Sequence, residues 1–145
     1  MTKERRKDAE REALFISRAN AANRFIQTVG MFALCVVMTI VAAVMDLPNL
    51  VALLVTVSTL PATLGFLWIV DRVKPAAASL ARIPRALRSV PLMVAAVVVA
   101  VLAAIALSLQ FGAGAGLVAH LLVYGAEFAL AVAIRARRVL RESPE

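Results

Sequence analysis

The chain has 145 residues, of which 62% are hydrophobic, and its mean hydropathy is +0.88. These values exceed what a water-soluble domain of this length needs, so they exclude a soluble globule and predict a membrane protein. The formal net charge of +7 would suit a nucleic-acid ligand, but the basic residues flank apolar blocks and fill no domain of their own, so we expect a lipid bilayer as partner and no nucleic acid.

Residues 1–24 form a basic segment without Pro or Gly. Apolar residues recur in and just after it at helical spacing, namely Phe15, Ala19, Ala22 and Ile26. This pattern predicts an amphipathic N-terminal helix lying on the membrane surface. The same composition also suits a solvated basic tail, and the sequence leaves both interpretations open.

The rest of the chain contains four apolar stretches, each about long enough to cross a bilayer as a helix. We expect an all-α, polytopic membrane protein with a transmembrane domain over residues 25–134. Its four transmembrane helices would form two hairpins, with spans at about 25–45, 50–70, 90–110 and 116–134. Asp46 and Asn49 flank Pro48 between the first two spans, so we expect a tight turn there with capping oxygens.

The sixteen Lys and Arg residues are divided very unevenly among the segments outside the spans. Seven lie in residues 1–24, five in the connection 71–89 and four in the tail 135–145, whereas the two remaining turns have none. Because positively charged segments stay in the cytoplasm, we expect both termini and the middle connection to be cytoplasmic. Arg far outnumbers Lys and the spans are rich in Ala and Val, which suggests a GC-rich bacterial genome and so the inner membrane.

The connection 71–89 alternates arginines with apolar residues. Arg82, Arg85 and Arg88 are interleaved with Leu80, Ile83 and Leu87 at roughly helical spacing. Such a segment is expected to rest in the headgroup layer, where each cation gains about 1 kcal/mol near anionic lipid. We therefore predict that these three arginines contact anionic lipid headgroups.

The fourth span is the one apolar stretch with ionisable side chains inside it. His120, Tyr124 and Glu127 fall at i, i+4 and i+7 and so share one helix face. Glu127 lies within about 3 Å of the centre of the span, where an acid is costly unless it is protonated or paired. The expected partners are hydroxyl groups of the second span, for which the candidates are Ser58 and the face formed by Thr56, Thr59 and Thr63.

Two roles fit these polar residues. Glu127 would be interhelical glue if it is protonated and hydrogen-bonded to a neighbouring helix, or it would belong to a proton or cation path that includes Tyr124 and His120. The same helix carries a run of small residues, Gly125, Ala129 and Ala133, at which another helix could approach closely.

Motifs for chemistry are missing from the sequence. It has one cysteine, Cys35, inside an apolar span, which we expect to be a packing residue, and it has no metal-ligand cluster, phosphate-binding Gly loop or nucleophile elbow. We therefore expect no enzyme, no catalytic residue, no metal and no cofactor. The layout of two hairpins with a basic cytoplasmic connection resembles that of small ATP-synthase accessory proteins and of some four-helix phage holins, without a shared motif.

These observations favour a small non-enzymatic inner-membrane protein. It would act through helix–helix and protein–protein contacts as an accessory, regulatory or assembly factor, with a membrane-protein partner or as a homo-oligomer. The alternative is a permeation protein, that is a small proton-linked transporter, a channel or a holin-like pore, which would use Glu127.

Overall fold

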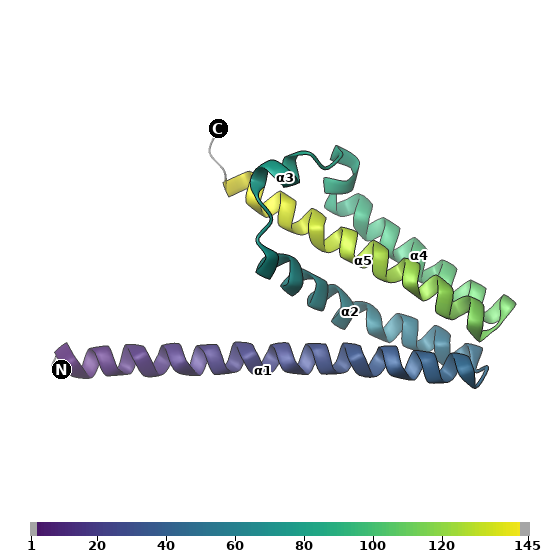
Figure 1. Ribbon diagram of the computed structural model, residues 1–145, viewed down its shortest axis with the longest axis horizontal. Coiled ribbons are helices and arrows are strands. Elements are labelled where there is room, and N and C mark those ends of the chain that lie inside the picture. Colours follow the sequence, from purple (N-terminus) through teal and green to yellow (C-terminus); the bar gives the residue numbers. More distant parts are fainter. Residues whose placement is uncertain (1–2, 143–145) are drawn as a thin grey trace.

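In a computed structural model that describes residues 3–142, the chain is a bundle of four long helices (Figure 1). The long helices are α1 (Lys3–Val44), α2 (Pro48–Val73), α4 (Val90–Phe111) and α5 (Ala113–Glu142), and two short ones, α3 (Ala77–Ala81) and the 3₁₀ helix η1 (Arg85–Arg88), lie between α2 and α4. Residues 3–142 contain no strand. All four long helices are apolar and long enough to cross a membrane, which confirms the all-α fold with four candidate spans.

Three of the four long helices are longer than the spans predicted for them. Only α4 agrees with its prediction to within one residue. Helix α5 continues to Glu142, because the arginine-rich sequence after Ile134 contains good helix formers and no Gly or Pro until Pro144. The arginines at 135–141, expected in a tail, therefore lie on the last turns of α5.

Helix α1 shows the largest difference from the predicted spans. It has 42 residues and would be about 63 Å long, roughly twice the thickness of a hydrocarbon core. Residues 3–24 are helical, as one of the two interpretations expected, and all are exposed. There is no break at residue 24, and Figure 1 shows a straight rod whose N-terminal part projects beyond the bundle. A helix lying flat on the membrane would require a bend that this structure lacks.

The turn between α1 and α2 is closed by the backbone. Asp46 has φ 52°, the N–H of Leu47 donates to the carbonyl of Ala42 (2.8 Å) and the N–H of Asp46 donates to that of Ala43 (3.2 Å). These two bonds form a Schellman motif, after which Pro48 begins α2. The expected side-chain caps are not formed, since Leu47 occupies the N-cap position of α2 without a side-chain bond.

The turn between α4 and α5 consists of Gly112 alone. Its φ of 93° is readily adopted only by glycine, and a Cβ built on it would lie 3.7 Å from Oδ1 of Asp46. The two turns therefore lie together at one end of the bundle, which we call the turn end. The connection between α2 and α4 and the last turns of α5 lie at the opposite, basic end (Figure 1).

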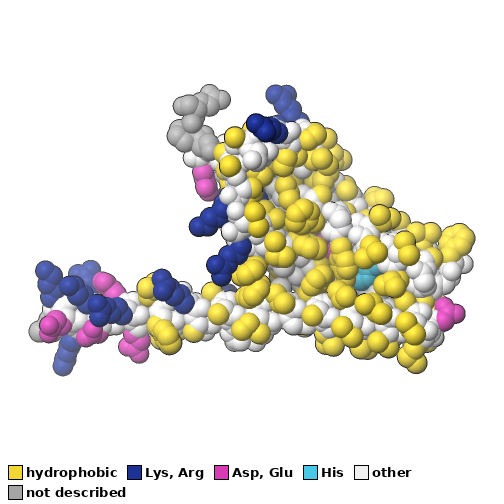
Figure 2. All heavy atoms as spheres, in the orientation of Figure 1, with side chains coloured by type: hydrophobic (Ala, Val, Ile, Leu, Met, Phe, Trp, Pro, Cys, Tyr) yellow, Lys and Arg dark blue, Asp and Glu magenta, His cyan; other side chains and the backbone are white. Residues whose placement is uncertain are grey.

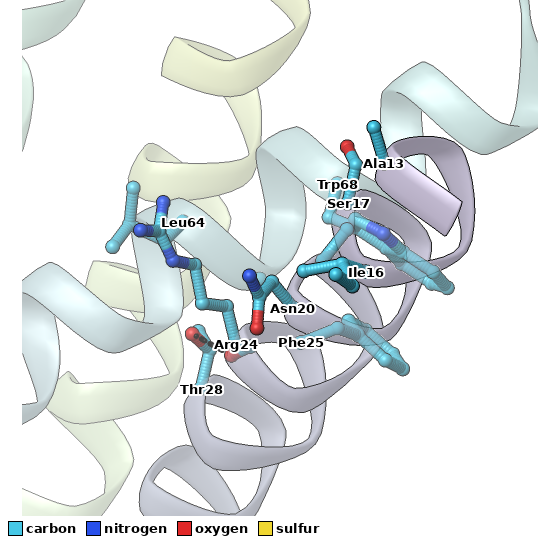
Figure 3. Close-up of a pocket in the computed structure, with 11 residues that line it drawn as sticks. Ala13, Ile16, Ser17, Asn20, Arg24, Phe25, Thr28, Leu64 and Trp68 are labelled. Carbon is cyan, nitrogen blue, oxygen red and sulfur yellow. Dashed lines mark hydrogen bonds between the residues drawn. The ribbon is translucent and has the colours of Figure 1, made fainter. Parts of the chain in front are cut away.

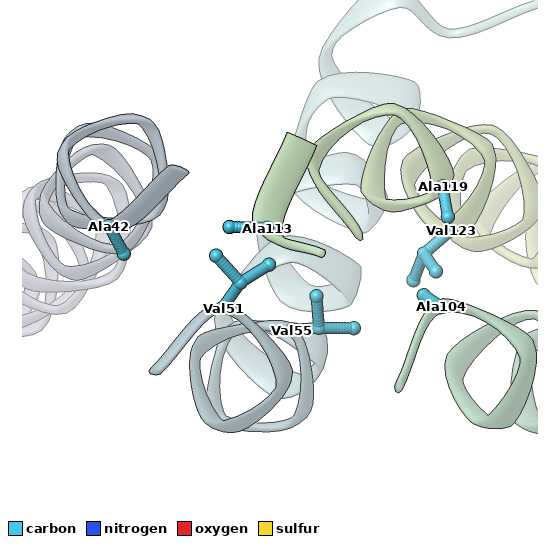
Figure 4. Close-up of a cluster of buried hydrophobic side chains, with 7 residues drawn as sticks. All are labelled: Ala42, Val51, Val55, Ala104, Ala113, Ala119 and Val123. Atoms are coloured by element: carbon cyan, nitrogen blue, oxygen red, sulfur yellow. The ribbon is translucent and has the colours of Figure 1, made fainter. Parts of the chain in front are cut away.

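Small residues pack the helices together near the turn end. All four long helices contribute to one cluster of buried side chains, shown in Figure 4: Ala42, Val51, Val55, Ala104, Ala113, Ala119 and Val123. Gly116 sits beside this cluster, and a Cβ placed on it would meet Cβ of Ser108 at 2.6 Å and Cγ1 of Val51 at 2.9 Å. Helices α2, α4 and α5 can approach this closely only because residue 116 has no side chain.

The predicted contact surface around Gly125 differs from what is observed. Gly125 is exposed, and a Cβ on it would have nothing within 4 Å. Ala133 is fully buried and belongs to a second cluster with Met93, Val97 and Leu130. Within residues 3–142, no other helix therefore approaches closely at Gly125, and the close approach occurs at Gly116.

Charged and apolar side chains separate along the molecule. Figure 2 shows Lys and Arg on the projecting part of α1 and at the basic end, with hydrophobic side chains over the flank between them. Helix α1 buries only Cys35, Thr39 and Ala42 among its residues, whereas α5 buries ten. Helix α5 is therefore the central element of the bundle, and α1 is its least covered member.

Candidate functional site

The three ionisable side chains of the fourth span point into the bundle. His120 is 1% exposed and Glu127 is 0% exposed, and Tyr124 between them is half-buried. The rings of His120 and Tyr124 lie against each other with their centroids 4.3 Å apart. The shared helix face that the sequence predicts is thus the face of α5 that is buried against α2 and α1.

Ser58 of α2 is the direct partner of His120. Its Oγ lies 2.9 Å from Nε2 of His120 and 3.2 Å from the carbonyl oxygen of Val55. In one imidazole tautomer, Nε2–H of His120 donates to the Ser58 oxygen while the Ser58 hydroxyl donates to the carbonyl of Val55. In the other tautomer, the Ser58 hydroxyl donates to the unprotonated Nε2. Ser58 is 0% exposed, so this pair forms an internal polar link and offers no nucleophile to a substrate.

The Glu127 carboxyl group lacks such a partner. Neither of its oxygens has a hydrogen bond within residues 3–142, and the same is true of the Tyr124 hydroxyl. Thr59 of α2 comes near enough to interact with the carboxyl, but its hydroxyl donates to the carbonyl of Val55 (3.0 Å). Since buried polar groups are nearly always satisfied, an unpaired acid at this position needs a further explanation.

The cost of this arrangement is large for so small a protein. Each buried polar group left without a partner costs about 1–3 kcal/mol, and more if it is charged. No Lys or Arg occurs in α5 before Arg135, which lies about 12 Å further along the helix. Arg135 is itself paired with Asp71, with Nη1 and Oδ1 3.3 Å apart. The carboxyl group therefore has no neighbouring cation on its own helix.

Aromatic rings from α1, α2 and α5 meet beside Tyr124. Tyr124 meets Phe32 of α1 edge to face at 5.3 Å and Phe66 of α2 at 6.4 Å, measured between ring centroids. Phe66 also contacts Phe128 of α5 at 5.7 Å. Three helices thus supply a group of aromatic rings that packs against the Tyr124 ring.

The second-span hydroxyls behave differently from one another. Thr59 faces Glu127 as expected, but Thr56 is exposed and donates to the carbonyl of Ala52 (3.0 Å), and Thr63 is half-buried. The three threonines were chosen as a face, whereas the buried face of α2 is formed by Val51, Val55, Ser58 and Ala62. Ser58, also among the predicted partners, shares a helical face with those apolar residues, and its bond is to His120.

Helix α1 adds one more buried polar residue to the region. Thr39 is 1% exposed, and its hydroxyl donates to the carbonyl of Cys35 (2.7 Å). Cys35 is a buried free cysteine. Within residues 3–142, no group of three His, Cys, Asp or Glu side chains is arranged to hold a metal ion.

The predicted headgroup arginines lie at the basic end, outside this cluster. Arg82 and Arg85 are exposed and Arg88 is partly buried. Nearby, Arg72 lies over the Trp68 ring at 5.1 Å, a combination of aromatic and cationic side chains that is common at membrane interfaces.

No protein-family model matches the chain, and no curated protein or solved structure shows significant similarity to it.

Proposed function

We propose that the chain is a non-enzymatic, multi-pass protein of a bacterial inner membrane that acts through helix contacts with another membrane protein or with a second copy of itself. Both termini and the connection 71–89 are cytoplasmic in this proposal. The uneven distribution of Lys and Arg supports that orientation, since all sixteen lie outside the two turns that meet at the turn end.

The observation that carries the proposal is the uncovered surface of α1. Leu14, Phe15 and Ile16 are 54%, 73% and 52% exposed. Ile16 lies nine residues before Phe25, which places it about 14 Å beyond the expected span in a straight helix. Apolar side chains at that distance lie beyond the lipid chains, and residues 3–142 leave them more than half exposed, so a partner would cover them.

A groove beside these residues provides a place for such a contact. It has a volume of about 1000 Å³, and Figure 3 shows its lining from α1 and α2. Ile16 and Phe25 are its larger apolar residues on α1, with Leu64 and Trp68 on α2. The rings of Phe25 and Trp68 stack at 3.6 Å and hold the two helices together at this level.

A photo-crosslinking residue placed at Asn20, inside the groove, tests the proposal in intact membranes. The control position is Val99 of α4, which is 65% exposed on an apolar helix. We expect a protein adduct of one defined mass from position 20 and only lipid adducts from position 99. An adduct of twice the chain mass identifies a second copy, and another single mass identifies a different partner. Identical adduct patterns from both positions would refute a specific contact.

Permeation is the second candidate, and the unpaired Glu127 carboxyl favours it. Interhelical glue requires a hydrogen-bonded partner, which neither oxygen has in residues 3–142. A polar route would pass from Ser58 and His120 to Glu127 and on towards the ion pair of Asp71 and Arg135.

Flux measurements in liposomes test this candidate. Glu127→Gln keeps the shape of the side chain but cannot ionise, so it should fold normally and abolish proton-dependent flux if Glu127 carries protons. Thr56→Val is the control, because Thr56 is exposed and bonds only within its own helix. Wild-type liposomes without flux, under imposed pH gradients of either direction, would exclude the permeation role.

A further inference from the structure

An open pocket at the basic end gathers three arginines from two separate elements. It has a volume of about 370 Å³. Arg85 and Arg88 of η1 line one side, Arg137 of α5 lines the other, and Ser89 to Pro91 at the start of α4 complete it together with Leu140. The folding of the connection against α5 brings Arg137 to η1 although the two lie about fifty residues apart in the sequence.

The charges in this pocket are not compensated by the protein. Among residues 3–142, no Asp or Glu forms an ion pair with Arg85, Arg88 or Arg137, since the nearby Asp71 is occupied by Arg135 and Arg138. Nε of Arg88 is shielded from solvent and has no hydrogen-bond partner in the described chain. Three guanidinium groups that line one pocket without an acid give it a positive potential that favours an anion from outside the chain.

The beginning of α4 adds a further positive contribution. This helix has 22 residues, and its N-cap, Ser89, makes no side-chain capping bond. The first N–H groups of a helix have no partner within it, and its dipole places partial positive charge there. Pro91 has no N–H, so a phosphate group in the pocket would meet the N–H of Val90, the positive end of the dipole and the arginine forks together.

We propose that this pocket binds the phosphate of an anionic phospholipid headgroup. A lipid fits better than a free phosphate because the pocket adjoins the point where α4 enters its apolar stretch, and because Val90, Pro91 and Leu140 provide apolar walls. Basic pockets between transmembrane helices are a known type of headgroup site. The site differs from the predicted set of headgroup arginines, because Arg137 belongs to it and Arg82 lines a different groove.

The test compares two double variants that lose the same charge. Arg88→Gln/Arg137→Gln removes two pocket arginines, and Arg18→Gln/Arg141→Gln removes two exposed arginines outside the pocket. The full-length protein is purified in micelles that contain equal phosphatidylglycerol and phosphatidylcholine, and bound lipid is counted by native mass spectrometry. We expect the pocket variant to lose phosphatidylglycerol binding by about tenfold or more, because charge-assisted bonds are lost, and the control to change less than about twofold.

Three results would overturn the proposal. An equal loss in both variants would mean that the total surface charge attracts the lipid. Unchanged binding in the pocket variant would place the lipid elsewhere, and complete competition by inorganic phosphate at about the lipid concentration would identify a free-anion site. If the Gln pair does not fold, Arg88→Lys/Arg137→Lys replaces it, and loss of binding is again expected because Lys lacks the planar fork.

Discussion

Replacing Gly116 with alanine should destabilise the bundle, whereas the same change at Gly125 should not. Both glycines lie inside α5 and differ in what a new methyl group would meet. At position 116 it would lie 2.6 Å from Cβ and 2.7 Å from Oγ of Ser108, and 2.9 Å from Cγ1 of Val51. At position 125 it would meet nothing within 4 Å. Position 125 therefore serves as a matched control for the change in helix propensity.

The expected magnitude follows from three contributions. Overpacking of this kind costs about 1–3 kcal/mol. Moving Ser108 would also weaken its hydrogen bond to the carbonyl of Pro48 (2.8 Å), a loss of about 1 kcal/mol. Alanine in a helix interior recovers up to about 1 kcal/mol relative to glycine. Gly116→Ala should therefore lower the free energy of unfolding by about 1–3 kcal/mol, and Gly125→Ala should leave it unchanged or raise it by up to about 1 kcal/mol.

Reversible unfolding in mixed micelles, followed by circular dichroism, measures both values. Ser108→Gly combined with Gly116→Ala removes the two shortest contacts and leaves the one with Val51, so the double variant should recover part of the loss. A coupling free energy of about 0.5–3 kcal/mol between the two sites is expected. Equal stabilities of the two alanine variants would show that α4 and α5 are further apart at position 116 than the structure has them.

Three further predictions concern other contacts. Reporter fusions after Ala77 and Glu145 should indicate the cytoplasm and those after Asn49 and Gly114 the opposite side, and one reversed hairpin would contradict the proposed orientation. Ser58→Ala leaves Nε2 of His120 without its partner at 2.9 Å and should lower the free energy of unfolding by about 1–3 kcal/mol. The control Thr56→Val, on the exposed face, should lower it by less than about 0.5 kcal/mol. Equal unfolding free energies of the two variants would rule out the buried bond. Asp71→Asn removes a partly exposed link between α2 and α5 and should cost at most about 1 kcal/mol, with Glu10→Gln on the solvated part of α1 as a control without measurable effect.

Hydropathy and helical spacing were sufficient to predict most of the fold. The four apolar helices and the inward face of His120, Tyr124 and Glu127 follow from patterns within single segments. The ends of α1 and α5 were harder to predict, because a hydropathy pattern ends where charge begins, whereas a helix continues until a residue stops it. Arg135 and its neighbours are good helix formers, so α5 extends past the apolar stretch.

Contacts between helices could not be read from one segment at a time. Gly125 and Gly116 both lie in Ala-rich sequence, and only the rotation of α5 against α4 decides which of them meets a neighbour. Which of the α2 hydroxyl groups meets a polar residue of α5 has the same origin, since the buried face of α2 depends on where α5 and α1 lie. The pocket around Arg88 and Arg137 likewise depends on how the connection folds back onto α5.

The two halves of the bundle differ in a way that connects both proposed functions. Near the turn end, small residues and the Ser58–His120 bond fix four helices closely together. Towards the basic end α1 has few covered residues, and beyond the stacked Phe25 and Trp68 rings it leaves the bundle. Tyr124, on the same buried face as Glu127, contacts Phe32 and Phe66, which belong to the two helices that line the groove. A partner that moved α1 relative to α2 would therefore also move the aromatic rings that contact Tyr124, about one turn of α5 from the unpaired carboxyl group.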